Sequence, residues 1–310
     1  MPKKFKMKEY IFKKDKIENG GSVIVLGGFD SVHRGHRALI ARGYSLAKKL
    51  SVPLLVFTFD TDLSAVSPVK KGLVFTYAER LCIFGECGVN GVIRARFNEE
   101  FAKISPYEFL NSLKNDFSPK AILCGKDYSF GYKAAGNAEY AEAFCEKSGI
   151  TFGTMDFLQS GGEKISTRRI KELLTEGDIK KANYLLGEEY FIKAEIVHGR
   201  EEGRKIGFPT ANMLLDEQKY PIKRGVYFTK AEINGKTYLG ITNFGTAPTF
   251  GIDKLIVETH FADFSGNVYG KEITLRFADF LREDKKFESV GDLKNQLAAD
   301  LNAVIKTSGL

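Results

Sequence analysis

The chain has 310 residues, of which 43% are hydrophobic and 27% charged, and its formal net charge is +7. This length allows two domains with separate cores, and the composition is that of an ordinary globular protein. No apolar run reaches the roughly 20 residues of a transmembrane helix, and no hydrophobic segment follows the lysine-rich N-terminus. The sequence therefore predicts neither a membrane span nor a secretory signal.

The cysteines indicate the cellular compartment, and the positive charge indicates the class of binding partner. The four cysteines (Cys82, Cys87, Cys124 and Cys145) lack zinc-ligand spacing and are too few for a disulfide framework, so we interpret them as buried thiols in a reducing cytoplasm. The lysines are mixed with acidic residues along the chain. Attraction of anionic nucleotides explains this charge as well as nucleic-acid binding does, and nucleic acid is not the expected partner. The sequence carries no signal for an oligomeric state.

A strand-to-helix turn with two histidines is the most informative part of the N-terminal half. The aliphatic run 23–26 predicts a buried strand that ends at Gly27 and Gly28, and the apolar spacing after His36 predicts a helix that begins near the histidines. His33 and His36 would share the first turn of this helix, where unpaired N–H groups and the positive dipole end attract phosphate. Nucleotidyltransferases of the His-x-Gly-His type hold ATP in this way. The alternative is an ordinary turn with two surface histidines.

Strands and helices alternate through the rest of the N-terminal half. Further strands are expected at 52–59, 91–93, 121–123 and 150–154, and helices at 77–87, 106–114 and 137–147. This alternation predicts an α/β domain with a parallel sheet flanked by helices. Ligands of such sheets bind at the carboxyl ends of the strands, which is where His33 and His36 fall.

A change of hydrophobic period marks a second domain. Residues 166–181 predict two short helices, with Ser166 and Asp178 as N-caps, and Gly187 closes this region. Beyond it the period becomes two, and strands are expected at 191–197, 225–233, 236–243, 255–264 and 272–280. Asn234-Gly235 is a strong hairpin signal.

The chain ends in an amphipathic helix from 289 to about 306. We therefore expect an α/β domain over residues 1–185 and a small antiparallel β-barrel with a terminal helix over 186–310. The boundary should lie near 184–188.

A glycine-rich segment in the second domain is a candidate phosphate site. Gly199, Gly203 and Gly207 are spaced four apart and are followed by Phe-Pro-Thr-Ala-Asn. Glycines let backbone N–H groups approach phosphate, and Thr210 and Asn212 alternate onto one side of an extended segment, where their oxygens suit Mg2+. The alternative is a hairpin loop followed by an edge strand.

A later strand favours the phosphate site. Glu258 and His260 share one strand face, and Asp263 lies beyond them. A carboxylate on a barrel strand is usually solvated, so Glu258 alone is weak evidence. Neither a Walker A sequence nor His-Glu-x-x-His occurs in the chain, so the familiar kinase and metalloprotease motifs are absent.

Several motifs together resemble those of one family. Gly27-Gly-Phe-Asp-Ser-Val-His-Arg-Gly-His36 is similar to its Gly-x-Phe-Asp-Gly-Val-His-x-Gly-His element, and Gly125-Lys-Asp-Tyr-Ser-Phe-Gly131 to its Gly-x-Asp-Phe-x-Phe-Gly element. Residues 203–212 match its Gly-Arg-x-x-Gly-Phe-Pro-Thr-Ala-Asn in full, and 243–250, 269–270 and 280–287 are also close. Over nearly its whole length the chain thus resembles the bacterial bifunctional riboflavin kinase/FAD synthetase family.

The resemblance implies a kinase reaction in the C-terminal barrel, in which ATP phosphorylates riboflavin to FMN. It implies ATP binding by Gly203, Gly207, Phe208, Pro209, Thr210 and Asn212. Thr210 and Asn212 would also hold Mg2+. Glu258 would be the general base, because a carboxylate must lie within hydrogen-bond reach of the attacking hydroxyl.

The resemblance also implies that an N-terminal Rossmann-like nucleotidyltransferase domain joins FMN to the AMP of a second ATP, giving FAD and pyrophosphate. It implies ATP binding by Gly28, Phe29, Asp30, His33, His36, Ser166, Thr167 and Arg168, and FMN binding by Asp127 and Phe130. His33 and His36 would donate hydrogen bonds to the charge that develops on the phosphates.

Four departures from the family pattern leave alternatives open. Ser31 replaces a glycine, residues 59–64 lack the common Pro-His-Pro, and Thr167 and Arg168 replace serine and threonine. Ala247 stands where a larger polar residue is common. One alternative is a riboflavin kinase with a weakly active or inactive nucleotidyltransferase domain. Another is a non-catalytic flavin- or RNA-binding regulator, although such a protein needs no general base.

Overall fold

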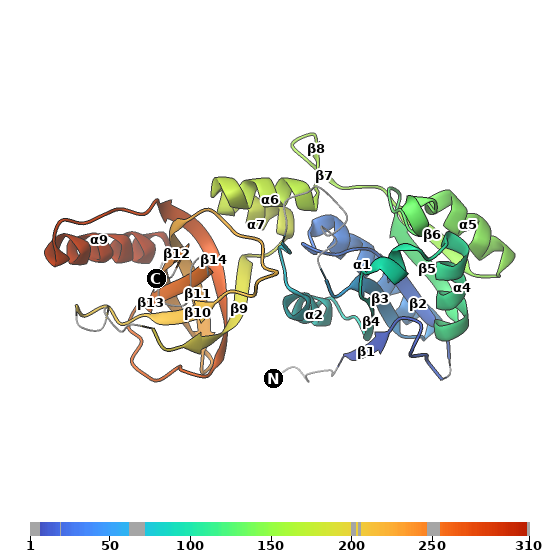
Figure 1. Cartoon of the computed structure of the whole chain (residues 1–310), viewed down its shortest axis with the longest axis horizontal. Coiled ribbons are helices and arrows are strands. Elements are labelled where there is room, and N and C mark those ends of the chain that lie inside the picture. The colour runs from blue at the N-terminus through green and yellow to red at the C-terminus, as the bar shows by residue number, and fades with distance from the viewer. Residues whose placement is uncertain are drawn as a thin grey trace. The chain divides into compact units, whose positions relative to one another are not determined.

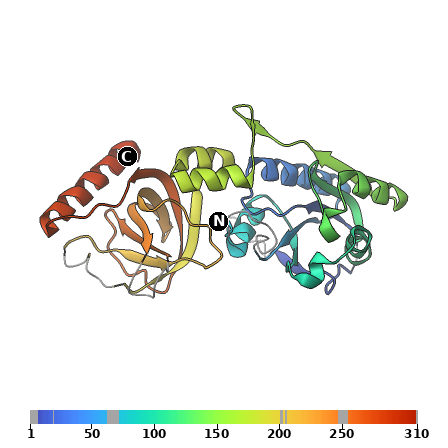
Figure 2. The same cartoon turned by 45° about the horizontal axis from the view of Figure 1, so that its top comes forward.

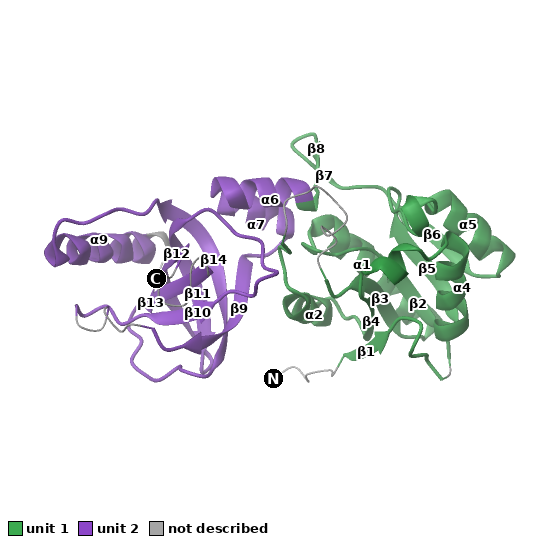
Figure 3. Cartoon of the chain, viewed as in Figure 1, with its two compact units in different colours: residues 1–167 green, residues 168–310 purple. Residues whose placement is uncertain are grey.

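The computed structural model describes residues 7–18, 20–61, 72–199, 203, 206–246 and 255–308. The chain divides into two compact units, unit 1 over Met1–Thr167 and unit 2 over Arg168–Leu310 (Figure 3). Ala247 and part of the segment 59–64, two of the departures from the family pattern, lie outside the described residues.

Unit 1 is built on a six-stranded sheet with the order β1-β4-β3-β2-β5-β6, in which every neighbouring pair is parallel (Figure 1). The strands are β1 (Lys8–Ile11), β2 (Ser22–Leu26), β3 (Leu54–Phe59), β4 (Gly91–Ala95), β5 (Pro119–Gly125) and β6 (Thr151–Met155). The residues of β2 and β3 are buried along their whole length, as expected for strands covered on both faces. The predicted parallel sheet is confirmed, and β1 is an edge strand that the sequence did not reveal.

Helices cover both faces of this sheet. They are α1 (Arg34–Leu50), α2 (Tyr77–Glu86), α3 (Glu99–Ala102), α4 (Pro106–Phe117) and α5 (Ala138–Lys147), with a 3-10 turn, η2 (Tyr132–Ala134). On one face α1 packs closely against the sheet at Gly43, where a Cβ would lie 2.5 Å from Val25 Cγ2. On the other face α4 and α5 pack on Ile24 and Phe57, which alternate with the residues under α1.

Unit 2 is dominated by a closed six-stranded barrel with the order β10-β13-β12-β11-β14-β9 (Figure 2). Its strands are β9 (Tyr190–Val197), β10 (Ala211–Leu214), β11 (Gly225–Ile233), β12 (Lys236–Thr246), β13 (Leu255–Phe261) and β14 (Glu272–Arg282). Asn234 and Gly235 both have positive φ, 53° and 78°, as a type I′ turn between β11 and β12 requires. The predicted barrel and hairpin are confirmed.

The described residues also include the helices α6 (Thr167–Glu176), α7 (Ile179–Leu186) and α9 (Val290–Ser308). Arg282 at the end of β14 donates to both carboxylate oxygens of Asp300 on α9, at 2.8 and 3.2 Å. Asn183 of α7 donates to the carbonyl of Phe277 on β14 at 2.8 Å. By its contacts α7 therefore groups with the barrel. The division between the two units, after Thr167, lies N-terminal to the expected boundary at 184–188. Within the described residues, no helix is both long enough and apolar enough to cross a membrane.

Candidate functional site

The histidine turn lies where β2 ends and α1 begins. His33 is the N-cap of α1, and its Nδ1 accepts a hydrogen bond from the backbone N–H of His36 at 3.2 Å. This bond fixes the tautomer of a neutral His33, because an accepting Nδ1 leaves the proton on Nε2. The two rings are stacked, with centroids 3.7 Å apart and planes 9° apart. The predicted helix start at the histidines is confirmed.

Burial keeps both histidines neutral. Desolvation lowers the pKa of His33 from 6.5 to about 4, the positive charge of Lys164 adds to this, and Asp127 acts in the opposite direction. Desolvation also lowers the pKa of His36 well below its usual value. His36 Nδ1 is buried and has no hydrogen-bond partner among the described residues. The pair therefore offers neutral N–H donors and a buried ring nitrogen without a partner.

A cavity of about 860 Å³ opens at this turn in unit 1. Its polar lining includes Gly28, His33, His36, Asp127, Lys164, Ser166 and Thr167. Its aromatic lining includes Phe59, Phe97, Phe101, Phe109, Tyr128 and Phe130. A concave apolar pocket with a few converging polar groups is the usual form of a small-molecule site.

The structure thus brings seven of the ten residues predicted for the first site onto one cavity: Gly28, His33, His36, Asp127, Phe130, Ser166 and Thr167. Phe29 is 1% exposed, and its ring packs edge-on against His36 at 5.0 Å. Asp30 accepts a hydrogen bond from Val74 N at 2.6 Å, and Arg168 is an exposed side chain that lies 3.9 Å from Glu172. Phe29, Asp30 and Arg168 do not line the cavity, and their contacts with ATP stay predictions.

Asp127 and Lys164 form an ion pair at the cavity wall. Lys164 comes from β8 (Glu163–Lys164), which pairs with β7 (Gln159–Ser160) in a small hairpin. The Lys164 ammonium also lies 5.2 Å from the ring centroid of Phe157. The sequence analysis missed Lys164, which adds a positive charge to the polar lining.

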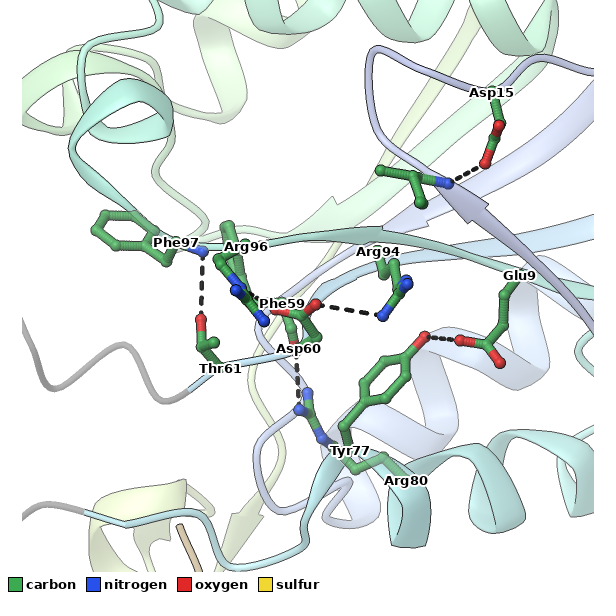
Figure 4. A network of polar contacts seen from close by, with 11 residues as sticks. Glu9, Asp15, Phe59, Asp60, Thr61, Tyr77, Arg80, Arg94, Arg96 and Phe97 are labelled. Carbon is green, nitrogen blue, oxygen red and sulfur yellow. Dashed lines mark hydrogen bonds and ion pairs between the residues drawn. The ribbon is translucent and has the colours of Figure 1, made fainter.

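Arg80 of α2 holds the ends of two central strands together. Its side chain is 1% exposed and donates to the carbonyls of Gly28 (3.2 Å) and Phe59 (2.8 Å) and to Thr58 Oγ1 (2.9 Å). Figure 4 shows the guanidinium reaching Phe59 from the helix below. Thr58 in turn donates to the Gly28 carbonyl at 2.8 Å, so this carbonyl accepts two hydrogen bonds. Gly28 and Phe59 both line the cavity, so Arg80 shapes its wall.

Asp60, directly after β3, forms ion pairs with two arginines at the end of β4. Arg94 lies 3.4 Å from Asp60 Oδ2, and Arg96 lies 4.0 Å from Oδ1 (Figure 4). Asp60 is largely buried, with 14% of its side chain exposed. These ion pairs join β3 to β4 beside the aromatic end of the cavity, where Phe59 and Phe97 pack at 5.5 Å.

In unit 2, strand register places three polar residues in one row. Glu258 on β13 is directly opposite Asn212 on β10 and Asn243 on β12, so the three side chains share one face. Asn243 Nδ2 donates to Asp284 at 2.7 Å. Asn212 is 3% exposed, whereas Glu258 is exposed. Asn212 and Asn243 therefore flank Glu258 in neighbouring strands, and the place of Asn243 in this row is one that the sequence analysis missed.

Asn212 has the most buried side chain of this row. Its Oδ1 is buried and accepts no hydrogen bond from the described residues. A Cβ at Gly199 would lie 2.3 Å from Asn212 Nδ2, so glycine there makes room for the amide. Because β10 is paired with both β9 and β13, the alternative of an edge strand is wrong.

The turn at residues 207–209, before β10, is held by a backbone hydrogen bond and by His260. Phe208 N donates to the carbonyl of Gly203 at 2.8 Å, and a Cβ at Gly203 would lie 2.3 Å from Phe208 O. His260 Nδ1 donates to the Pro209 carbonyl at 2.9 Å, and its ring meets Phe208 edge-on at 5.0 Å. His260 therefore fixes the turn that leads into Thr210, a contact that the sequence did not reveal.

Metal ligands in this row are limited to oxygens. No group of three His, Cys, Asp or Glu side chains that could hold a metal occurs in the described part of the chain. The buried amide oxygen of Asn212 is the kind of ligand that Mg2+ accepts, together with phosphate oxygens. The residues present therefore fit an ion that arrives with a nucleotide.

Two family models match the chain. The riboflavin kinase family matches residues 186–307, and the FAD synthetase family matches residues 15–169. The residues 170–185, which make up most of α6 and α7, lie between the two matches.

Curated relatives match over most of their length. A bifunctional riboflavin kinase/FMN adenylyltransferase from Listeria monocytogenes is 34% identical over 92% of both chains. The protein of the same name from Escherichia coli K12 is 33% identical over 90% of both. A crystal structure from Streptococcus pneumoniae described as a macrolide-efflux protein is 29% identical, with a TM-score of 0.86, over 96% of this chain and 99% of its own.

Proposed function

Because this chain belongs to the bifunctional riboflavin kinase/FMN adenylyltransferase family, we propose that unit 1 carries the adenylyltransferase site and unit 2 the kinase site. The enzyme phosphorylates riboflavin with ATP to give FMN. It then joins FMN to the AMP part of a second ATP to give FAD and pyrophosphate. The positions of the two family matches support this division. Domains over residues 1–185 and 186–310 fit both matches, whereas by their contacts residues 168–185 group with unit 2.

The cavity of unit 1 suits FMN and ATP together. About 860 Å³ is within the usual range for a site that encloses a small organic ligand. The phenylalanine lining offers apolar faces for an isoalloxazine ring, with Phe130 and Asp127 as its predicted contacts. The glycine, histidine and hydroxyl groups at the other end suit phosphates.

The chemistry proposed for unit 1 needs no general base. The phosphate of FMN is already a nucleophile, and it attacks the α-phosphorus of ATP while pyrophosphate leaves. The neutral His33 ring carries its proton on Nε2, because its Nδ1 accepts from His36 N. This N–H can stabilise charge that develops on the phosphates, and it is already oriented before the ligand binds.

The chemistry proposed for unit 2 needs both a base and charge neutralisation. Glu258 accepts the proton of the ribityl 5′-hydroxyl as that oxygen attacks the γ-phosphorus of ATP and ADP leaves. Thr210 and Asn212 would hold Mg2+, which supplies neutralising charge at the phosphates. The buried Oδ1 of Asn212, which has no hydrogen-bond partner among the described residues and lies directly opposite Glu258, supports this arrangement.

One observation carries the proposal for unit 1, the unit that holds Ser31 and Thr167, two of the departures from the family pattern. The two histidines, stacked and neutral at the N-terminus of α1, open onto the cavity that Asp127 and Phe130 also line. The test is to incubate the protein with riboflavin, ATP and Mg2+ and to separate the flavins. FAD supports both sites, and FMN alone would leave a kinase with an inactive nucleotidyltransferase unit. Unchanged riboflavin would contradict the kinase site, and the same incubation started from FMN would then test unit 1.

We further propose a cytoplasmic enzyme whose partners are flavins and nucleotides. All four cysteines are free thiols, as a reducing compartment requires. Cys124 and Cys145 are buried as expected, whereas Cys82 and Cys87 are only half-buried.

A further inference from the structure

Two residues that depart from the family pattern touch each other. Ser31 Oγ and Thr167 Oγ1 are 2.8 Å apart, although they are separated by 136 positions in the chain. Ser31 lies in the turn between β2 and α1, two residues before His33, and is completely buried. Thr167, the last residue of unit 1, lines the cavity together with Ser166 and the histidines.

The direction of this hydrogen bond follows from burial. A buried hydroxyl needs an acceptor for its proton, and Thr167 is the hydrogen-bond partner of the Ser31 hydroxyl in the described part of the chain. Ser31 therefore donates and Thr167 Oγ1 accepts. The proton of Thr167 is then directed away from Ser31.

The turn around Ser31 is one that needs restraint. Phe29 and Val32, on either side, have positive φ values of 51° and 37°, which are costly for residues with a Cβ. Asp30 is held by Val74 N, and Ser31 by Thr167. Ser31 itself does not adopt a positive φ, so a side chain is tolerated there without strain.

We propose that Ser31 is a positioning residue for adenylyl transfer, which donates to Thr167 so that the Thr167 proton is presented to a phosphate oxygen of ATP. The inference rests on the proposed adenylyltransferase function of unit 1. The two departures then form a matched pair. A glycine at position 31 makes no such bond, and the β-branched Thr167 has fewer rotamers than the serine it replaces.

The test measures the KM for ATP in FAD synthesis and the affinity for inorganic pyrophosphate, the product of adenylyl transfer. Ser31→Ala should raise both the KM and the pyrophosphate Kd about fivefold, the size expected for loss of one hydrogen bond, with kcat changed less. The kinase reaction of Ser31→Ala should match the wild type. Thr167→Ser keeps the accepting oxygen, so it should weaken both measures less than Thr167→Val, which removes that oxygen.

A double-mutant cycle decides between positioning and a general loss of structure. Thr167→Val should weaken both measures, and adding Ser31→Ala should cause little further loss, because the bond is already absent. Unchanged ATP and pyrophosphate binding in Ser31→Ala, or losses that multiply in the double variant, would overturn the inference. A wild-type protein that makes no FAD would instead count against the proposed function, and the pyrophosphate titration would still decide the role of Ser31.

Discussion

The imidazole rings of His33 and His36 lie face to face, 3.7 Å apart between centroids, at the start of α1. Two charged rings at this distance would repel strongly in a buried setting. Burial and mutual repulsion both favour the neutral forms, and this relationship determines how unit 1 responds to acid.

Acid should destabilise unit 1 through these histidines. In the unfolded chain each histidine takes up a proton near its usual pKa of 6.5, whereas in the folded chain the pKa of His33 is about 4. The unfolded state therefore binds more protons between these values, and the free energy of unfolding falls as the pH is lowered from 6.5 to 4. The depression at His33 alone corresponds to about 3 kcal/mol.

Urea unfolding followed across this pH window checks the histidine prediction. The control is the variant His33→Gln, His36→Gln, which lacks both titrating groups. Its free energy of unfolding should fall less steeply with acid than that of the wild type. Parallel pH profiles for the two proteins would show that the histidines are not held neutral.

Arg80 should be needed for the stability of unit 1. Replacing it by methionine leaves the Phe59 carbonyl without its donor and removes one of the two donors to the Gly28 carbonyl. We expect a loss of about 2–3 kcal/mol, typical for hydrogen bonds of a charged group to buried acceptors. Arg80→Lys, which keeps the charge and some donors, should lose less. A loss below about 0.5 kcal/mol in Arg80→Met, within the range of ordinary surface substitutions, would contradict this role.

The kinase unit should be more stable on its own when it keeps its preceding helices. Asn183 of α7 donates to the Phe277 carbonyl and accepts from Tyr190 N, and Leu186 is fully buried. A fragment over residues 168–310 should therefore make FMN from riboflavin and unfold cooperatively. A fragment over 187–310 keeps the barrel but loses these contacts, and it should unfold at a lower temperature. Equal stability of the two fragments would show that α7 is dispensable.

Periodic patterns predicted most of the fold. The aliphatic runs of β2 and β3 and the apolar spacing of α1 are strong local signals, and Asn234-Gly235 specified its hairpin. The four residues of β1 have no such pattern, because the strand is an exposed edge whose place depends on pairing with β4. α7 joins the barrel through contacts with residues about 90 positions away, which local patterns do not contain.

Motifs predicted the residues of the candidate sites, whereas they did not predict the residues that hold these sites in place. A charged residue on a helix is expected at the surface, so no local pattern indicated that Arg80 is buried against Gly28. The Ser31–Thr167 bond joins residues 136 positions apart. The position of Asn243 beside Glu258 depends on strand register, which a single sequence does not reveal.

The most direct test of the two-site account is a reciprocal product analysis of two variants. Glu258→Gln, supplied with FMN and ATP, should still make FAD, while its formation of FMN from riboflavin should fall by roughly 10²–10⁴-fold, as expected for loss of a general base. His33→Ala with His36→Ala, supplied with riboflavin and ATP, should accumulate FMN and make little FAD. If either variant lost both activities while remaining folded, or if Glu258→Gln reduced FMN formation by less than about tenfold, the assignment of one reaction to each unit by these residues would be contradicted.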